Sequence, residues 1–287
     1  MPTDAELLGR WPQVVLDQAA SKSLVLVLGA GVSKNAVNGA GDTPPTWPTL
    51  LEQLTGAFAP QGHKTYARKL VKQGRLLEAA ELLRGLAIEQ GKEQDFLEHI
   101  IRSVDGPIAD PFRPATIHNA ILDLTPLTII TTNYDRVLER AAGTGFSYLN
   151  AESDEIGRSV RVGRPIVIQM HGVVTEPQSL VLGRSDYTTV RRSGAHALEV
   201  VEALFTTRTA LFVGYSLSDP DMQLLLENVL GGREGPGSHY ILSPKLRPHE
   251  AQLLRYCYGL APIQYHDTSE VTRMMELLSG AIGGDIP

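Results

Sequence analysis

Cysteine is almost absent from this sequence, since Cys257 is the only one among 287 residues. A single cysteine excludes a disulfide framework within the chain, and it excludes a zinc site made of several cysteines. Because Cys257 lies in the apolar stretch 253–258, we expect its thiol to be buried and to pack as a small hydrophobic group.

Long apolar runs, a signal peptide and basic tracts are also missing. No apolar stretch approaches the roughly 20 residues that span a bilayer, and residues 1–10 have no apolar core. The net charge of −6, from 26 basic and 32 acidic residues, lacks the positive footprint of a nucleic-acid-binding protein. No His-x3-His pattern or carboxylate cluster suggests a metal site. We therefore expect a cytoplasmic enzyme or interaction protein, with no metal, no membrane contact and no direct nucleic-acid binding.

What is present is an alternation of apolar runs and amphipathic helices, in a chain long enough for one large α/β domain or two small ones. The run Leu24–Leu28 is apolar throughout and ends at Gly29, which is typical of a strand buried on both faces of a parallel sheet. Further strands are expected at 127–131, 145–149, 165–170, 209–213, 238–243 and 262–266, and helices at 7–20, 134–142, 195–207, 219–230, 247–257 and 269–282. This order predicts an α/β fold, a Rossmann-like parallel sheet with helices on both faces.

Between the first two strands the periodicity is only helical. Candidate helices lie at 50–58, 65–73, 75–90, 93–104 and 114–122, and Pro48 suits the first turn of the first of them. The sequence therefore predicts a helical insertion at about 50–122, after the first strand. Two other segments are expected to be irregular: 152–164, as a short loop or hairpin, and 231–238, as a glycine-rich loop.

Four of the predicted strands end on a cluster of small or polar residues. The clusters are Gly29-Ala30-Gly31-Val32-Ser33, Thr131-Thr132-Asn133-Tyr134-Asp135, His171-Gly172 and Gly214-Tyr215-Ser216-Leu217-Ser218-Asp219. Ligands of open parallel sheets bind at the carboxyl ends of the strands. We therefore expect these four clusters to form a single site.

Each cluster also has a purely structural interpretation. In the first cluster, the glycines are suited to a phosphate-binding turn. However, Lys34 stands where a dinucleotide-binding fingerprint has its third glycine, and the alternative is a tight turn without a ligand. Thr and Asn cap helices and Asp suits a first turn, so the second cluster could be a cap. A histidine at a strand end is often structural, and Ser218 or Asp219 could cap a helix that begins at Pro220.

Taken in order, the clusters resemble the motifs of the sirtuin family. Gly29, Ala30, Gly31 and Ser33 match its first motif, Asn133 and Asp135 its Gln-Asn-x-Asp motif, His171 and Gly172 its catalytic His-Gly, and Gly214, Ser216 and Leu217 its Gly-Thr-Ser-Leu element. The match spans positions 24 to about 230. The resemblance implies that residues 1–287 form a single SIR2-like domain.

Several departures resemble a bacterial branch of that family. The four zinc cysteines of protein-deacylating sirtuins are missing, Pro44-Pro45-Thr46-Trp47 replaces Pro-Asp-Phe-Arg, and Thr132 replaces Gln. Leu182 precedes Asp186-Tyr187 as in the bacterial SIR2-like proteins. The resemblance implies an NAD⁺ hydrolase without zinc module that releases nicotinamide and ADP-ribose, as the toxic effector of an anti-phage abortive-infection system.

The resemblance also implies a role for each motif. Asn133 is expected to contact the ribose or the attacking water, and His171 to accept a proton from one of them, so these two are the expected catalytic residues. The expected NAD-binding residues are Gly29, Ala30, Gly31 and Ser33 at the pyrophosphate, Gly214 and Ser216 at the ribose or phosphate, Tyr134 and Asp135 at the nicotinamide side, and Thr132 and Leu217 without an assigned subsite. From its position in the substituted segment, Trp47 is expected to cover the nicotinamide ring.

Partners and two rival functions follow from the same resemblance. Little sequence follows the last predicted helix, so we expect a separate activator or sensor protein, such as a short Argonaute or a HerA-like ATPase. We expect this partner to dock on the helical block or on other exposed helices. The resemblance also implies a homo-oligomer. The alternatives are an NAD-dependent protein deacylase and a non-catalytic regulatory protein that binds NAD⁺ or ADP-ribose. The sequence leaves hydrolysis and cyclisation open.

Overall fold

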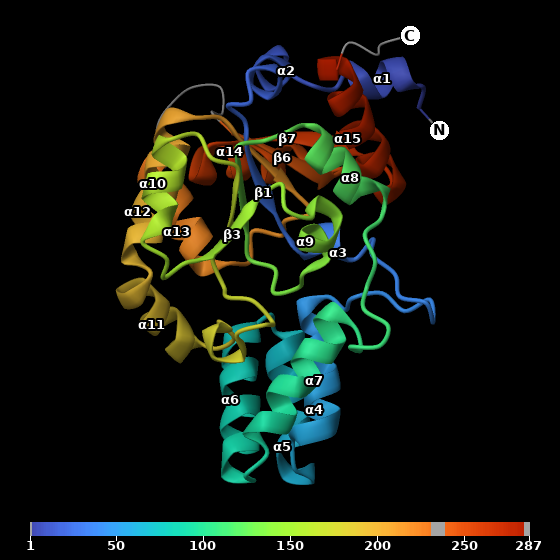
Figure 1. Ribbon diagram of the computed structural model, residues 1–287. Helices are drawn as coiled ribbons and strands as arrows, with labels where there is room; N and C mark the ends of the chain where they lie inside the picture. The colour runs from blue at the N-terminus through green and yellow to red at the C-terminus, as the bar shows by residue number, and fades with distance from the viewer. Residues whose placement is uncertain (1, 231–238, 284–287) are drawn as a thin grey trace.

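A sheet of parallel strands forms the centre of the protein (Figure 1). The computed structural model describes residues 2–230 and 239–283. Within these ranges the strands are β1 Val25–Leu28, β2 Thr128–Thr131, β3 Ser147–Asn150, β4 Ile166–Gln169, β5 Ala210–Val213, β6 His239–Pro244 and β7 Leu260–Tyr265. Their order is β3-β4-β2-β1-β5-β6-β7, and every pairing is parallel. The predicted parallel sheet is confirmed.

Strand β1 lies in the middle of this sheet and contributes to the core on each face. Val25 is in register with Thr128 of β2 on one side and with Ala210 of β5 on the other. The side chains of Leu26 and Leu28 pack into one core and those of Val25 and Val27 into the other. Each is at most 2% exposed, and full burial of such a side chain contributes about 1.5–3 kcal/mol. Burial on both faces explains the uninterrupted apolar run.

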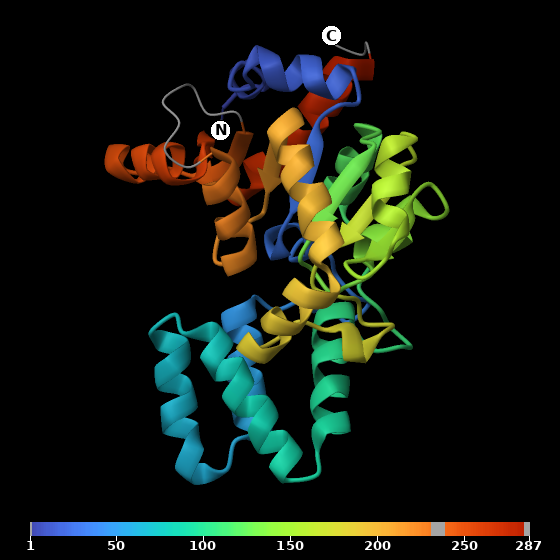
Figure 2. The same ribbon diagram turned by 90° about the vertical axis from the view of Figure 1, so that its left-hand side faces the viewer.

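Helices cover both faces of the sheet, as predicted (Figure 2). Leu26 and Leu28 share their core with residues of α1 Asp4–Leu8, α2 Gln13–Ala20, α8 Thr116–Asp123 and α15 Thr268–Gly283, and α9 Val137–Ala142 contacts α8. Val25 and Val27 share theirs with α10 Glu155–Arg161, α12 Ala195–Thr207, α13 Pro220–Leu230 and α14 Pro248–Tyr258. The short helix α3 Ala30–Ser33, the 3-10 turn Pro177–Ser179 and helix α11 Arg184–Ser193 lie in the connections that follow strands.

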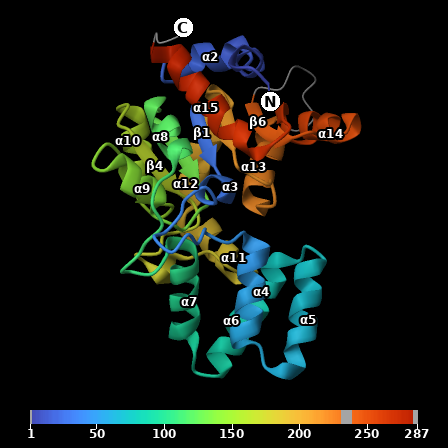
Figure 3. The same ribbon diagram turned by 90° about the vertical axis from the view of Figure 1, so that its right-hand side faces the viewer.

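A helical bundle extends beyond the carboxyl ends of the strands (Figures 1 and 3). It consists of α4 Trp47–Phe58, α5 Gln61–Lys72, α6 Leu76–Glu89 and α7 Glu93–Asp105. Its core includes Leu83 and Phe96, together with Leu180 and Leu182 from the connection after β4. The predicted helix 114–122 is α8, which packs on the face of the sheet against α15. The bundle therefore covers 47–105, rather than the expected 50–122.

Four local expectations differ from the structure. The helix expected at 7–20 is two helices, α1 and α2, because the chain turns at Gly9 and α2 starts after Pro12. The segment 152–164, expected to be irregular, contains α10, whose buried Ile156 anchors it to the sheet. Helix α11 was not expected, because its sequence is mostly polar and Tyr187 is its only buried residue. Cys257 is half-buried on α14 instead of buried. The loop expected at 231–238 lies outside the described residues.

Candidate functional site

The candidate site lies at β1, where the order in which the chain adds strands to the sheet reverses. Strand β2 flanks β1 on one side and β5 flanks it on the other, so the connections after β1 and β5 diverge to opposite sides of the sheet. Such a topological switch point is the usual position of a ligand in an open parallel sheet. The glycine turns at Gly29 and Gly214 follow these two strands directly.

Gly29 and Gly214 are required because the two turns that contain them are in direct contact. A Cβ on Gly29 would lie 2.5 Å from the carbonyl oxygen of Gly214, and one on Gly214 would lie 2.5 Å from the amide nitrogen of Val32. Gly214 also has φ +62°, which favours glycine. The amide of Gly31 donates to the carbonyl of Gly214 at 2.9 Å. That amide is therefore occupied within the protein, in agreement with the tight-turn interpretation, and ligand binding by this turn stays a prediction.

A cavity of about 990 Å³ opens over these turns, between the sheet and the bundle. Known ligand pockets span about 300–1,000 Å³, so this one is large. It is lined by every residue predicted to be catalytic or to bind NAD: Gly29, Ala30, Gly31, Ser33, Trp47, Thr132, Asn133, Tyr134, Asp135, His171, Gly214, Ser216 and Leu217. The four strand-end clusters and Trp47 of the bundle are thus brought together.

Asn133 is held by both hydrogens of its side-chain amide. Its Nδ2 donates to the carbonyl of Gly29 and to Oγ of Ser33, each at 2.9 Å. Ser33 Oγ in turn donates to Oδ2 of Asp135 at 2.6 Å, and Oδ1 of Asp135 accepts the amide of Val137 at 3.0 Å. Burial raises the pKa of Asp135 despite these two donors. The network fixes the Asn133 amide and turns its Oδ1 away from these contacts.

His171 is 7% exposed and forms a pair with Asp219. Its Nε2 lies 2.9 Å from Oδ2 of Asp219, which also accepts the hydroxyl of Tyr187 at 2.7 Å. Oδ1 of Asp219 accepts the amide of Met222 at 2.7 Å and so caps α13. Burial alone would raise the pKa of Asp219, but the charge and hydrogen bond of His171, with the other donors, lower it.

This pairing fixes the chemistry that the imidazole offers. A carboxylate that accepts from Nε2–H holds the hydrogen on that nitrogen and leaves Nδ1 as the basic one. The ring of Tyr187 stands edge-on to the imidazole, with centroids 5.2 Å apart. In its neutral form, the imidazole of His171 thus exposes a basic Nδ1 on the wall of the cavity.

The other predicted residues occupy the rim and the aromatic side of the cavity. The rings of Trp47 and Tyr134 meet edge to face with centroids 6.3 Å apart, and the Tyr134 hydroxyl donates to the carbonyl of Val181 at 2.6 Å. The hydroxyls of Ser216 and Ser218 share a hydrogen bond of 2.8 Å. Leu217 has φ +54°, an unusual backbone state for a branched residue.

Asp219 and Ser243 are polar residues of the cavity for which no individual role in catalysis or binding was predicted from the sequence. Asp219 belongs to the fourth cluster and was considered as a helix cap, and a sequence cannot show that its second oxygen would meet His171. Ser243 lines the cavity at the end of β6, is 6% exposed, and its Oγ has no hydrogen-bond partner among the described residues. The rule that identified the other clusters, a polar residue after an apolar run, applies to Ser243 as well.

Within 2–230 and 239–283, no three His, Cys, Asp or Glu side chains lie close enough together to hold a metal ion. No helix in the same ranges has both the length and the apolar character needed to cross a membrane.

Comparisons with known proteins show what the chain is similar to. The model of the SIR2-like domain matches residues 127–263, from the start of β2 into β7. Defense-associated sirtuin 2 of Bacillus subtilis is 25% identical over 221 residues, which are 74% of this chain and 20% of that protein. The NAD(+) hydrolase ThsA of Bacillus cereus is 29% identical over 148 residues, which are 48% of this chain and 30% of that protein.

The chain thus spans 20% to 33% of the length of the curated relatives that it matches. A solved chain from a study of the mechanism and regulation of Sir2 enzymes aligns over 93% of this chain and 98% of its own length, with a TM-score of 0.47 and 12% identity. The domain match, the defence-associated sirtuin and the ThsA proteins agree with the motifs that line the cavity. Residues 127–263 of the chain are thus similar to the SIR2-like domain.

Proposed function

We propose that this protein hydrolyses the bond between nicotinamide and ribose in NAD⁺. The observation that carries the proposal is the convergence of Asn133 and the His171–Asp219 pair on one large cavity at the switch point of the sheet. The relatives named as NAD(+) hydrolases support it.

The reaction needs little acid catalysis at the leaving group. Nicotinamide departs as a neutral molecule from a cationic pyridinium when the C1′–N bond breaks, and the ribose becomes oxocarbenium-like, as in other glycoside cleavages. Water then adds at C1′ and loses a proton, so the products are nicotinamide, ADP-ribose and one proton. The protein must orient the ribose, position the water and accept the proton.

His171 and Asn133 are suited to these tasks. In the neutral imidazole whose Nε2 donates to Asp219, Nδ1 of His171 carries no hydrogen and accepts the proton from the water or from a ribose hydroxyl. Oδ1 of Asn133 accepts a hydrogen bond from the same group, because Nδ2 is held by Gly29 and Ser33. General-base catalysis of this kind is worth about 10²–10⁴ in rate.

The remaining contacts follow the shape of the cavity. Trp47 and Tyr134 form an apolar wall for the nicotinamide ring. Gly29 and Gly31 let the pyrophosphate approach the backbone, and Lys34, exposed on the lining, supplies positive charge. Ser33 and Asp135 act indirectly, since their side chains hold Asn133 and each other.

The biological setting that we propose is anti-phage defence by depletion of NAD⁺. The name of the Bacillus subtilis relative, defense-associated sirtuin 2, supports a role in defence, and the name NAD(+) hydrolase of the Bacillus cereus relative supports the depletion of NAD⁺. Control by a separate activator, a short Argonaute or a HerA-like ATPase, and self-assembly are further parts of the proposal. The bundle, which extends away from the sheet (Figure 1), is the surface that we assign to such a contact.

The direct test is release of nicotinamide from NAD⁺ by the purified chain and by single variants. We expect His171→Ala and Asn133→Ala to lose at least about 100-fold in kcat. His63→Ala, an exposed histidine of α5, is the matched control and retains wild-type turnover. Tight NAD⁺ binding without nicotinamide release would support a binding protein instead, and release that requires an acylated peptide would support a deacylase.

A further inference from the structure

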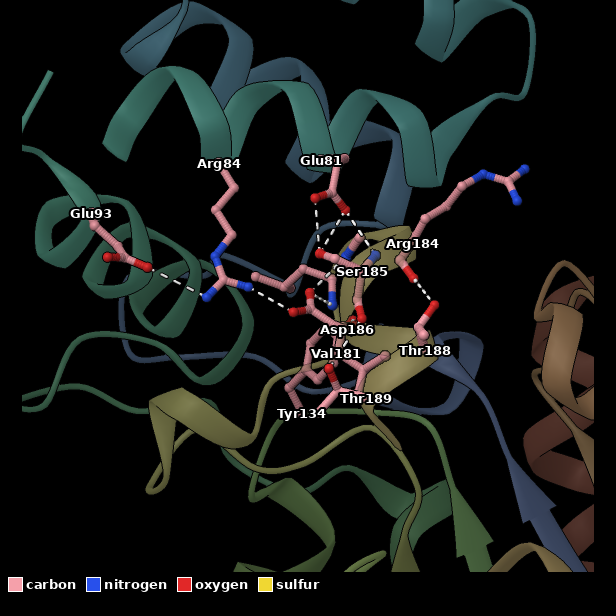
Figure 4. A network of polar contacts seen from close by, with 12 residues as sticks. Glu81, Arg84, Glu93, Tyr134, Val181, Arg184, Ser185, Asp186, Thr188 and Thr189 are labelled. Carbon is pink, nitrogen blue, oxygen red and sulfur yellow. Dashed lines mark hydrogen bonds and ion pairs between the residues drawn. The ribbon is translucent and has the colours of Figure 1, made fainter. Parts of the chain in front are cut away.

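Helix α11 links the bundle to the site, and its first turn is held by bundle side chains (Figure 4). Asp186, in that turn, accepts the backbone amides of Leu182 and Gly183 on Oδ2, at 3.0 and 2.9 Å. Its Oδ1 accepts Nη1 of Arg84 from α6 at 2.7 Å. One carboxylate thus closes the start of α11 and joins it to the bundle.

A second residue of α6 contacts the same turn. Glu81 accepts the backbone amide of Ser185 at 3.0 Å and the Ser185 hydroxyl at 2.8 Å. Glu81 and Arg84 are three positions apart and so lie on one face of α6. Arg84 and Asp186 are only 25% and 18% exposed, so solvent screens their ion pair less than a surface pair. We call Glu81 and Arg84 the α6 clamp.

The residue after Asp186 reaches the proposed catalytic pair. Tyr187 is 6% exposed, its hydroxyl donates to Asp219 at 2.7 Å, and its ring stands against His171. Neighbouring residues of one helical turn therefore contact the bundle and the catalytic pair. A shift of the first turn of α11 moves the Tyr187 hydroxyl relative to Asp219.

We propose that Glu81 and Arg84 are positioning residues: by fixing the first turn of α11 they place Tyr187 on Asp219 and so orient His171. The inference rests on the proposed function, because it assigns a role within the same reaction. It gives the bundle a way to influence turnover without touching the substrate. A protein that binds the bundle and displaces α6 would change kcat through this connection.

The experiment compares Arg84→Met, Arg84→Lys, Tyr187→Phe and the double variant of Arg84→Met with Tyr187→Phe, in the full chain. We expect Arg84→Met to lower kcat about fivefold or more, as for residues that share one network, with KM for NAD⁺ unchanged. Arg84→Lys keeps the charge and restores part of the loss. The double variant is no slower than Tyr187→Phe, since both changes act on one contact.

The matched control is Arg68→Met, which removes the ion pair of α5 with Glu52 of α4, also within the bundle. Equal losses in Arg68→Met and Arg84→Met, multiplication of the two effects in the double variant, or a change confined to KM would each overturn the inference. Amide hydrogen exchange distinguishes failure of this inference from failure of the proposed function. If the α6 clamp fixes α11, the amides of α11 exchange faster in Arg84→Met than in the wild type, whether or not the chain releases nicotinamide. Unchanged exchange in α11 would refute the inference.

Discussion

Replacement of Asp219 by asparagine tests the orientation of His171 with little change in shape. Asparagine caps helices about as well as aspartate, so Oδ1 still accepts the amide of Met222 and α13 keeps its start. The amide Nδ2 then faces His171 in place of the Oδ2 that lies 2.9 Å from Nε2. Two N–H groups cannot hydrogen-bond to each other, so the hydrogen moves to Nδ1 and the basic nitrogen turns toward residue 219.

The magnitude follows from the loss of a correctly placed base. We expect kcat to fall by about 10²–10⁴, which is about 3–5 kcal/mol of activation free energy, with little change in the KM for NAD⁺. Nicotinamide release, followed over a range of NAD⁺ concentrations, measures both constants. A thermal unfolding curve close to that of the wild type shows that the helix cap has survived.

Asp267→Asn is the matched control. Asp267 accepts the amide of Ser269 at 2.8 Å at the start of α15 and is not part of the cavity lining. It therefore changes a helix-capping carboxylate without touching His171, and its kcat is expected to equal that of the wild type. A kcat for Asp219→Asn within threefold of the wild type would refute the assignment of the base.

Three other substitutions test the packing, the buried histidine and the cavity. Gly214→Ala introduces a Cβ 2.5 Å from the Val32 amide nitrogen at φ +62°, whereas Gly143 has φ +56° with open space around it. In urea unfolding, we expect Gly143→Ala to lower the free energy of unfolding by about 1–2 kcal/mol and Gly214→Ala to lower it clearly more. Equal losses would contradict the contact between the two turns. Burial lowers the pKa of His118 from 6.5 to about 4, so between these pH values the unfolded chain binds a proton that the folded protein does not. The free energy of unfolding should therefore fall by at most about 3 kcal/mol as the pH drops from about 6.5 to 4. An equally steep pH dependence in His118→Gln would show that it does not come from His118. Ser243→Ala removes the buried hydroxyl and should raise the KM for NAD⁺ roughly 5- to 10-fold at constant kcat, the value of about one hydrogen bond; an unchanged KM would mean that Ser243 does not contact the substrate.

The sheet and the place of the site could be predicted because both depend on local patterns. A strand buried on both faces must be apolar throughout, and Leu24–Leu28 shows this without structural information. The carboxyl ends of parallel strands meet at one edge, so residues such as Asn133 and His171 could be expected to converge, and they line the same cavity.

The contacts between side chains could not be predicted, because they depend on the tertiary arrangement. Asp219 reads as a helix cap, and it is one, but its other oxygen meets His171 across 48 positions of sequence. Helix α11 was missed because its sequence is mostly polar. Polar contacts with Glu81 and Arg84 support its first turn. The roles given to Ser33 and Asp135 remain predictions, and the structure directs their side chains to Asn133 and Val137.

The most direct test of the central claim is a crystal structure of the His171→Ala variant with NAD⁺. We predict intact NAD⁺ in the cavity between the sheet and the bundle, with the nicotinamide ribose within hydrogen-bonding distance of Asn133 Oδ1 and beside residue 171. NAD⁺ bound elsewhere, or with its nicotinamide ribose remote from both residues, would contradict the account.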